Sequence, residues 1–205
     1  CTVSLGVLQA DLIEFSPPLP EWKRTALNEM QMFLFSKVYI KLNKKLVQKN
    51  QITFCTNTNK KGHYPLWMKY RNTNNNEDIF MCYIGGKEAQ RVESLSTEEI
   101  KNEIETLLRN AFPKTNQDEN IFRPIDVYVT DWSKNPNFCG SYSVYPVHAF
   151  AQIPHEHLRK GLNNNEEEVI LYFAGEAYDD KFNGWVQGAY LSGERVAKQV
   201  MGITS

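Results

Sequence analysis

The sequence predicts an α/β protein in which a mixed sheet is flanked by helices. Three observations support this fold class: a helix-start pattern at residues 96–99, several short β-type runs bounded by turn residues, and an apolar run at 169–173 followed by an amphipathic segment at 186–200. Strand-like and helix-like segments therefore follow one another along the chain, as in domains built from a sheet with helices packed against it. Both chain ends are expected to return to a second region.

The first predicted helix follows a proline-rich stretch at 17–20. Prolines stiffen the approach to a helix and are tolerated in its first turn. The helix is expected to begin near Glu21, and Trp22, Ala26 and Met30 then fall on one face. One apolar face of this kind indicates a helix that packs against a core.

A second helix is predicted after Ser96-Thr97-Glu98-Glu99, which is a capping-box pattern. Its apolar residues form one stripe, made of Ile100, Ile104, Leu107, Leu108 and Ala111. Pro113 is expected to end it. This is the helix for which start, stripe and end signals all agree.

Strands are predicted where apolar and β-branched residues lie between linkers rich in Asn, Lys and Gly. The run at 125–129 is almost wholly apolar or β-type, and it predicts a buried strand. The complete set of predicted strands is 2–8, 33–42, 52–56, 66–70, 79–84, 125–129 and 169–173.

The last fifty residues contain a strand end followed by a helix start. The run at 169–173 stops at Gly175, and Glu176 places a carboxylate at the carboxyl end of the strand, where ligands of open α/β sheets bind. An Asn183-Gly184 turn then opens a helix at Val186. The free N–H groups of such a helix start favour a negatively charged ligand.

Composition excludes some classes of function. A net charge of −1 argues against a general nucleic-acid or anionic-membrane surface, and 41% hydrophobic residues suffice for a globular core. No apolar run reaches the roughly 18–20 residues of a membrane span. The four cysteines form no CxxC pair, so no metal site is expected and the disulfide state stays open. The chain does not begin with Met and is expected to be an excerpt from a longer one.

Several motifs in one order carry a resemblance to a known family. The chain resembles the C-terminal portion of the flavin-dependent amine oxidases, and among them it is most similar to plant-type polyamine oxidases. The resemblance covers nearly the whole chain. Its motifs are Thr2-Val3-Ser4-Leu5-Gly6-Val7-Leu8-Gln9, Leu19-Pro20-Glu21-Trp22-Lys23, Phe35-Ser36-Lys37-Val38-Tyr39-Ile40-Lys41, Asp131-Trp132-Ser133, Gly140-Ser141-Tyr142-Ser143, Leu171-Tyr172-Phe173-Ala174-Gly175-Glu176 and Phe182-Asn183-Gly184-Trp185-Val186.

The resemblance implies a division into domains. Residues 1–12 would end a segment of the FAD-binding domain, residues 13–130 would form most of the substrate-binding domain, and residues 131–205 would complete the FAD-binding domain. No G-x-G-x-x-G motif occurs in this sequence. The Rossmann half of the FAD domain is therefore expected upstream, as the missing N-terminal half of the same polypeptide.

The resemblance also implies the chemistry. The full-length enzyme would use FAD to oxidise a polyamine, spermine or spermidine, at a carbon next to a secondary amine. The resulting imine would hydrolyse, and O₂ would be reduced to H₂O₂. Lys37 matches a lysine that binds a water at the flavin and assists this chemistry. Tyr142 and Trp185 match two aromatic residues that flank the substrate amine, and Phe35 is placed at the wall of the same pocket.

Five residues match cofactor contacts by the same resemblance. Glu176 and Gly175 would meet the ribityl or pyrophosphate region, Gly184 and Val186 the pyrimidine edge of the flavin, and Trp132 the flavin ring. Trp185 departs from the pattern, because plant-type polyamine oxidases usually have Tyr there.

Three alternatives stay open. An L-amino-acid oxidase would need an arginine or an equivalent group for the substrate carboxylate, and no arginine of this chain lies in a recognised pocket motif. A monoamine oxidase of the same family is the second alternative. A truncated, non-catalytic paralogue that acts as a binding protein is the third alternative, and the 205 residues alone are expected to be inactive and to bind no FAD stably. The compartment is not indicated.

Overall fold

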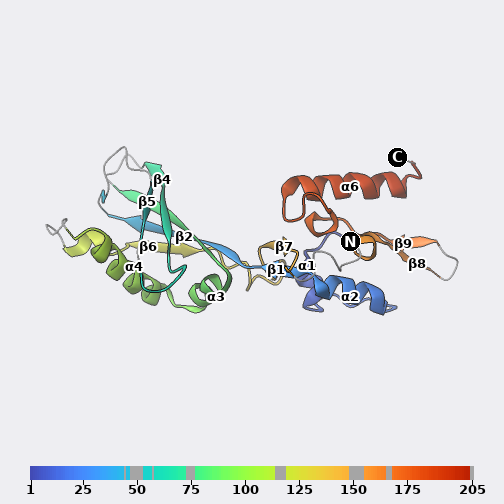
Figure 1. The fold of residues 1–205 in the computed structure, drawn as a ribbon, viewed down its shortest axis with the longest axis horizontal. Helices are drawn as coiled ribbons and strands as arrows, with labels where there is room; N and C mark the ends of the chain where they lie inside the picture. Colours follow the sequence, from blue (N-terminus) through green and yellow to red (C-terminus); the bar gives the residue numbers. More distant parts are fainter. Residues whose placement is uncertain are drawn as a thin grey trace. The chain divides into compact units, whose positions relative to one another are not determined.

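The computed structural model describes residues 1–43, 45–46, 53–56, 58–72, 77–113, 119–147, 155–164 and 168–203. These residues form two compact units (Figure 1). The first unit combines Cys1–Phe33 with Trp132–Ser205, and the second unit is Leu34–Asp131. Each unit has its own hydrophobic core.

The second unit is built on a five-stranded antiparallel sheet with strand order β3-β4-β5-β2-β6. Its strands are β2 (Phe35–Leu42), β3 (Thr53–Cys55), β4 (Leu66–Asn72), β5 (Asp78–Gly85) and β6 (Asp126–Val129). The α/β class with helices flanking a sheet is confirmed. The strand directions are not mixed, however, because every pair among the described strands of this sheet is antiparallel. Of the predicted strand 52–56, Ile52 lies outside the described residues.

Two helices cover one face of this sheet, α3 (Gly86–Ser94) and α4 (Thr97–Ala111), and a short 3₁₀ turn, η1 (Glu119–Phe122), follows them. Alternate residues of β2, namely Val38, Ile40 and Leu42, point into the core with Phe80 and Cys82 of β5. The opposite face of β2 carries half-buried side chains, which are Phe35, Lys37, Tyr39 and Lys41. The sheet therefore has a packed apolar face and an aromatic, cationic face.

The capping box predicted for α4 is present. Ser96 Oγ accepts a hydrogen bond from the Glu99 N–H at 3.3 Å, and the Glu99 carboxylate accepts one from the Ser96 N–H at 2.8 Å. Both bonds satisfy N–H groups that a helix start leaves without intrahelical partners. The start of α4 is thus as predicted, and the helix ends at Ala111, just before Pro113. Four residues of the predicted stripe are buried, and the fifth, Ala111, is exposed.

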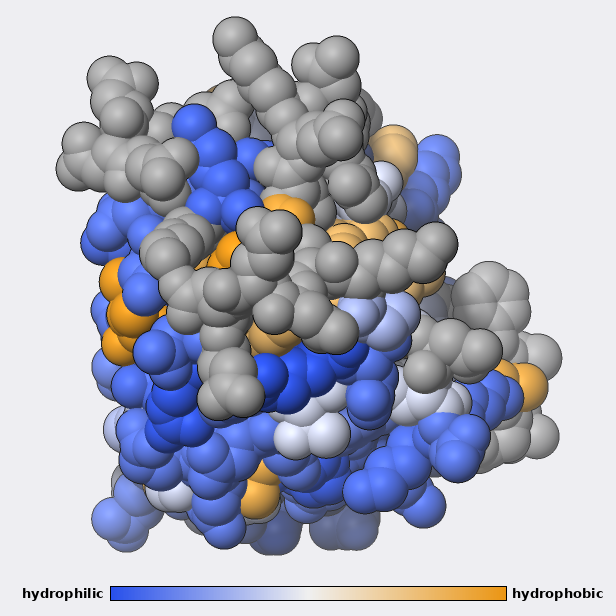
Figure 2. Space-filling model, turned by 90° about the vertical axis from the view of Figure 1, so that its left-hand side faces the viewer, coloured by the Kyte–Doolittle hydropathy of each residue, from blue (hydrophilic) through white to orange (hydrophobic). Residues whose placement is uncertain are grey.

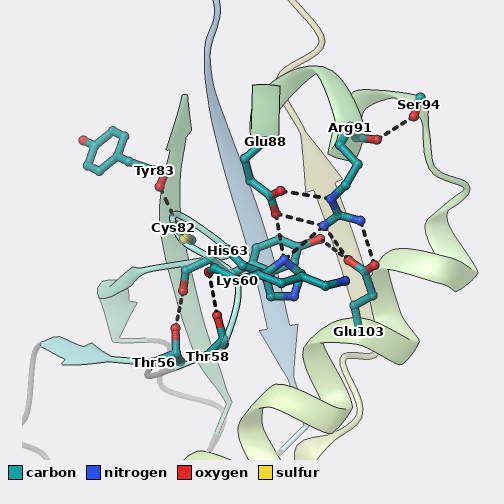
Figure 3. A network of polar contacts seen from close by, with 11 residues as sticks. Thr56, Thr58, Lys60, His63, Cys82, Tyr83, Glu88, Arg91, Ser94 and Glu103 are labelled. Atoms are coloured by element: carbon teal, nitrogen blue, oxygen red, sulfur yellow. Dashed lines mark hydrogen bonds and ion pairs between the residues drawn. The ribbon is translucent and has the colours of Figure 1, made fainter. Parts of the chain in front are cut away.

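A polar network ties α3, α4 and the turn before β4 together (Figure 3). Arg91 of α3 donates to Glu88 on its own helix, with Nε–Oε2 at 2.9 Å, and to Glu103 on α4, with Nη1–Oε1 at 2.7 Å. His63 Nδ1 lies 2.9 Å from Glu88 Oε1, and the buried Tyr64 donates to Glu103 at 3.1 Å. Although burial acts in the opposite direction, Arg91 and His63 together hold the pKa of Glu88 below its usual value.

Figure 2 shows the side of the molecule that lies on the left of Figure 1. Where it is coloured, this surface is mostly hydrophilic, and its hydrophobic patches are small and separate. The apolar residues of the second unit are accordingly concentrated in its interior, where Trp67, Phe80 and Val38 are fully buried.

The first unit is assembled from both ends of the chain. Its elements are α1 (Leu5–Gln9), α2 (Glu21–Glu29), β1 (Gln31–Phe33), β7 (Tyr142–Val144), α5 (His155–Arg159), β8 (Leu162–Asn163), β9 (Val169–Leu171), the 3₁₀ turn η2 (Glu176–Tyr178) and α6 (Val186–Val200). Leu5, Leu27 and Phe173 lie in one buried cluster, so residues from both segments share the core. The compact units divide at Phe33/Leu34, because α2 packs on α1 and α5 within the first unit.

Two predicted strands are corrected by the structure. The run at 2–8 contains the helix α1, because Ser4 caps its start with a hydrogen bond from the Val7 N–H and the core buries Leu5 and Leu8. The run at 125–129 forms β6, which is an edge strand with exposed and half-buried residues and is not buried. Hydrophobic composition alone does not separate an edge strand from a central one.

The helix predicted at 186–200 is present as α6. Gly188 and Ser192 form its buried face, and Gly188 lies so close to the Phe182 carbonyl that a Cβ would meet its oxygen at 2.2 Å. No helix among the described residues is long and apolar enough to cross a membrane. The four cysteines are free thiols.

Candidate functional site

Tyr142 and Trp185 line the same pocket, which has a volume of about 440 Å³. All of its lining residues belong to the first unit, although they come from two segments of the sequence. They are Tyr142, Ser143, Val144, Tyr145, Asn183, Gly184 and Trp185. The two aromatic residues that were predicted to flank a substrate are therefore brought together, with β7 on one side and the turn before α6 on the other.

Tyr142 is held by strand pairing. It lies opposite Phe33 in the antiparallel pair of β1 and β7, and the two rings are 5.5 Å apart between centroids. Burial raises the pKa of Tyr142, and burial is also the main cause that raises the pKa of Tyr145 to about 12. Both pocket tyrosines therefore remain neutral phenols near pH 7.

Gly184 allows the turn before α6 to approach β7. Its φ of +78° is a left-handed conformation that glycine adopts without strain. A Cβ at this position would meet Ser143 O at 3.2 Å and Tyr142 Cδ2 at 3.3 Å. Both conformation and space thus favour glycine here.

The carboxylate of Glu176 joins the two segments of the pocket. Its Oε1 accepts a hydrogen bond from the Ser143 N–H at 2.9 Å. Its Oε2 accepts from Ser143 Oγ at 2.6 Å and from the Gly184 N–H at 2.6 Å. Asn183 Nδ2 donates to the same serine hydroxyl at 2.6 Å. The cluster of Glu176, Ser143, Asn183 and Gly184 thus fixes β7 to the turn before α6.

The start of α6 is open. Trp185 occupies its N-cap position without supplying a side-chain hydrogen bond, and its side chain is 65% exposed, while Val186 in the first turn is 85% exposed. Backbone N–H groups of a helix start attract an anionic or hydrogen-bond-accepting ligand. This helix start therefore fits the acceptor edge of a flavin.

Gly175 lies between the end of β9 and η2, in a conformation with φ of +145°. Its N–H donates to Ser192 Oγ at 2.9 Å, and that hydroxyl donates back to the Gly175 carbonyl at 2.8 Å. These two hydrogen bonds anchor the loop at Gly175 on the buried face of α6. A loop without side-chain bulk, held in this way, is suited to the close approach of a cofactor.

Trp132 begins the second segment of the first unit. Its ring packs edge-on against Phe138 at 5.3 Å, and its carbonyl accepts a hydrogen bond from the Gly140 N–H at 3.1 Å. Its side chain is 39% exposed. It is absent from the residues that line the Tyr142 and Trp185 pocket, so its expected contact with the flavin ring stays a prediction.

Lys37 and Phe35 lie in the second unit, on the aromatic face of the sheet. Lys37 stands opposite Tyr83 in the register of β2 and β5, and its Nζ lies 5.7 Å from the centroid of the Tyr83 ring. The rings of Phe35 and Tyr83 stack at 5.2 Å. Thr130 fixes the backbone of Lys37, because Thr130 Oγ1 accepts from the Lys37 N–H at 2.8 Å.

Sequence reasoning missed Ser143, Asn183 and Tyr145 as members of the site. Ser143 follows Tyr142 in β7, Tyr145 comes directly after the end of that strand, and Asn183 precedes Gly184 in the predicted turn. The sequence signal that could have identified these three residues is that each lies within three positions of a predicted site residue. No group of three or more His, Cys, Asp or Glu in the described part of the chain is placed to hold a metal ion.

Comparison with known proteins defines the class to which this fold and this site belong. The family model for flavin containing amine oxidoreductases matches residues 1–201. The chain belongs to this family, and FAD, the expected cofactor, is the cofactor of the class.

The matching proteins include plant polyamine oxidases. Polyamine oxidase 7 of Oryza sativa subsp. japonica is 30% identical over 194 residues, which are 94% of this chain and 39% of that protein. Polyamine oxidase 1 of Zea mays is 30% identical over 200 residues, covering 94% of this chain and 37% of that protein. The chain thus spans less than half the length of these curated relatives.

Solved structures share the fold. Putrescine oxidase bound to putrescine superposes with a TM-score of 0.68 at 16% identity, over 98% of this chain and 42% of that one. Cyclohexylamine oxidase from Brevibacterium oxydans IH-35A gives a TM-score of 0.63 at 17% identity, over 97% of this chain and 42% of that one. At these identities the likeness establishes the fold alone.

Proposed function

We propose that the full-length polypeptide carrying this chain oxidises a polyamine, spermine or spermidine, at a carbon next to a secondary amine, with FAD as cofactor and O₂ as the final acceptor. The observation that carries the proposal is the pocket that Tyr142 and Trp185 form directly before the open start of α6. The 30% identity to plant polyamine oxidases supports the substrate class.

The chemistry of the pocket favours an amine over an amino acid. Its lining residues in the described part carry no charged side chain. The carboxylate of an amino acid would lose its hydration there without a charged partner, which is costly. An alkylamine instead gains contact with two aromatic faces, and any residual positive charge is attracted to them by about 0.5–2 kcal/mol.

Bound FAD would accept the hydride equivalent that leaves the amine carbon. The residues of this chain would then hold the amine and exclude water, with Tyr142 and Trp185 as the walls of the slot. The Val186 N–H, at the start of α6, would offset negative charge at the cofactor edge, and Gly184, whose own N–H is held by Glu176, would lie beside that edge. Gly175, Glu176 and Trp132 are the further proposed cofactor contacts.

Lys37 is proposed to hold the water that hydrolyses the imine or takes part in the oxygen reaction, and Phe35 is proposed as a substrate-binding residue. Lysine suits the first role because its ammonium group can donate up to three hydrogen bonds from a flexible stem. The aromatic neighbours of Lys37 restrict the position of that stem.

The test is peroxide release by the full-length protein with spermine, spermidine, a monoamine and an L-amino acid. We expect activity on the polyamines and a loss of at least about tenfold in Lys37→Met, in line with the removal of a group that assists proton transfer. Lys41→Met is the matched control, because Lys41 lies on the same face of β2 and pairs with Glu77 at 3.0 Å.

The substrate panel also separates the alternatives. Activity on the monoamine or the L-amino acid alone would replace the polyamine proposal with the corresponding oxidase. Absence of peroxide with every substrate, although the flavin is bound, would contradict an oxidase function.

A second candidate is a non-catalytic binding protein, and the exposed side of α6 favours it. Val186, Tyr190 and Val200 are 85%, 72% and 63% exposed on this helix. An apolar surface of this kind commonly binds another protein surface. If these 205 residues act alone, we expect no FAD to remain after desalting, and a flavin absorption spectrum that persists would contradict this.

A further inference from the structure

We infer that Glu176 is a positioning residue that, through Ser143 and Gly184, sets the spacing of Tyr142 and Trp185 across the amine pocket. The inference rests on the proposed function, because it assigns a role to Glu176 in the substrate slot in addition to a cofactor contact. The groups that donate hydrogen bonds to this carboxylate belong to Ser143 and Gly184, which are the sequence neighbours of Tyr142 and Trp185.

Each wall of the pocket is one residue away from a donor to Glu176. Ser143, which follows Tyr142, donates through both its N–H and its hydroxyl group. Gly184, which precedes Trp185, donates through its N–H. One carboxylate therefore fixes the backbone beside both aromatic residues, and the distance between the two rings depends on it.

The cluster is partly buried. Ser143 is fully buried, and its hydroxyl donates to Glu176 while it accepts from Asn183; Glu176, Asn183 and Gly184 are half-buried. A carboxylate has about four acceptor positions, and three of those of Glu176 are occupied by groups of this chain. Most of its hydrogen-bonding capacity is thus used to hold protein segments together.

Strand geometry explains why a side chain is needed here. Among the described strands, β7 pairs with β1 alone, and Ser143 stands opposite Met32 in that pair. The N–H of Ser143 is bonded to Glu176. Glu176 thus accepts the hydrogen bond of the Ser143 N–H, which would otherwise be an unsatisfied buried donor at the edge of β7.

The substitution Glu176→Gln tests this arrangement because it preserves the size of the side chain. The amide has one acceptor oxygen, and its NH₂ group can only donate. In one orientation the NH₂ group faces the Gly184 N–H, and in the other it faces the Ser143 N–H. Either way, at least one of the two backbone anchors is lost.

Two further variants calibrate the result. Ser143→Ala keeps both backbone bonds and removes only the hydroxyl, so its effect is expected to be smaller. Glu194→Gln is the matched control, because Glu194 is an exposed residue of α6 that pairs with Lys198 at 2.9 Å. Any effect of Glu194→Gln measures the loss of a surface carboxylate in the same unit.

The first readout is amide hydrogen exchange in the full-length protein, which requires no activity. We expect Glu176→Gln to speed exchange at least about tenfold in one or both of the peptides that cover 141–146 and 182–187, since hydrogen bonds to a charged acceptor are strong and their loss permits local opening. Unchanged exchange in both peptides would overturn the inference, whether or not the protein oxidises amines.

The second readout is peroxide release in a double-mutant cycle with Trp185→Ala. If Glu176 acts through the aromatic slot, Glu176→Gln should lower kcat/KM for the preferred amine at least about tenfold in the wild-type background and less than about threefold in Trp185→Ala. Equal factors in both backgrounds would contradict a positioning role.

A pure cofactor role for Glu176 gives a different pattern. It predicts that Glu176→Gln loses flavin on desalting and regains normal kcat when excess FAD is added, and this result would overturn the inference. If the wild-type protein oxidises no amine, the proposed function fails, and the exchange measurement alone decides the role of Glu176.

Discussion

Lys23 is a fully buried cation in the first unit, and backbone oxygens surround it. Its Nζ donates to the carbonyls of His157, Leu158 and Lys160 at 3.1, 2.6 and 3.0 Å, and it lies 3.7 Å from the centroid of the Phe173 ring. The three acceptors lie at the end of α5, where carbonyl groups have no intrahelical partners. Lys23 therefore links α2 to the end of α5.

The protonation of Lys23 should make stability depend on pH. Burial lowers its pKa to about 7 from 10.5, and the positive charge of Arg195 acts in the same direction. Between about pH 7 and 10.5 the unfolded chain then binds more protons than the folded one, so the free energy of unfolding rises with pH, by at most about 1.4 kcal/mol per pH unit from this group.

Urea unfolding of the wild type and of Lys23→Met at pH 7, 8 and 9 checks this. The expected result is a difference between the two proteins in the slope of stability against pH. Parallel profiles would show that Lys23 has the same pKa in the folded and unfolded states.

Gly184 should tolerate no side chain. In Gly184→Ala, the φ of +78° adds about 1–2 kcal/mol of strain, and the new Cβ would press on the carbonyl of Ser143 and the ring of Tyr142. Gly193→Ala is the control, because Gly193 lies within α6 with no neighbour within 4 Å of a Cβ, and alanine is the better helix former by about 1 kcal/mol. The midpoint temperature of thermal unfolding should be lower than that of the wild type for Gly184→Ala and higher for Gly193→Ala.

At the scale of single residues, the sequence predicted which residues line the pocket better than it predicted the hydrogen bonds that hold them. Tyr142, Gly184 and Trp185 are identified by short motifs and are found around one pocket. The partners of Glu176 were not predictable, because Ser143 is distant in sequence and nothing local indicates which buried donors a carboxylate will meet. Such contacts are fixed only when the two segments pack.

At the scale of elements, the α3–α4 pair is stabilised by Arg91 as well as by apolar packing. Arg91→Met would leave Glu88 and Glu103 near each other without the cation that binds both. We expect a loss of about 1–2 kcal/mol in the free energy of unfolding of the second unit, since these hydrogen bonds are charge-assisted and partly shielded from water.

Arg123→Met is the matched control for that substitution. Arg123 also contacts two glutamates, Glu98 and Glu105, but the side chain of Glu98 is 65% exposed, against 15% and 28% for the two partners of Arg91. Water screens such contacts, so the loss should be smaller. Chemical denaturation followed by circular dichroism compares the two variants, and equal losses would mean that the Arg91 network adds nothing beyond a surface contact.

Prediction of elements succeeded where local signals were complete. The capping box, the stripe and the terminal proline of α4 all lie within its own sequence, and its bounds were foreseen. The sequence predicts a strand where the five-residue helix α1 lies, because a helix this short depends on its packing against Leu27 and Phe173 and not on local propensity. The edge position of β6 likewise depends on strand order, which a single segment does not encode.

At the scale of the whole molecule, the two cores share no residue among those that the structure describes. The core of the second unit draws only on residues between Leu34 and Val129, and the core of the first unit draws only on the two flanking segments. A fragment of residues 34–131 should therefore fold by itself. Its expected signature is a cooperative urea transition, since it retains a complete core of its own.

The same reasoning predicts the opposite for the flanking segments. Residues 1–33 and 132–205, expressed separately, should each lack a cooperative transition, because Leu5 and Leu27 need Phe173 and Tyr178 to complete their cluster. Cooperative unfolding of either segment alone, or its absence in 34–131, would contradict the division into two units.

The split of the first unit along the chain has a consequence for biosynthesis. A ribosome releases Cys1–Phe33 long before Trp132–Ser205, and the second unit can close on itself in the interval, which lasts several seconds at about 5–20 residues per second. During that time α1 and α2 emerge with their apolar faces uncovered. The segment Cys1–Phe33 is thus open to chaperones and to mispairing until Trp132–Ser205 has been made.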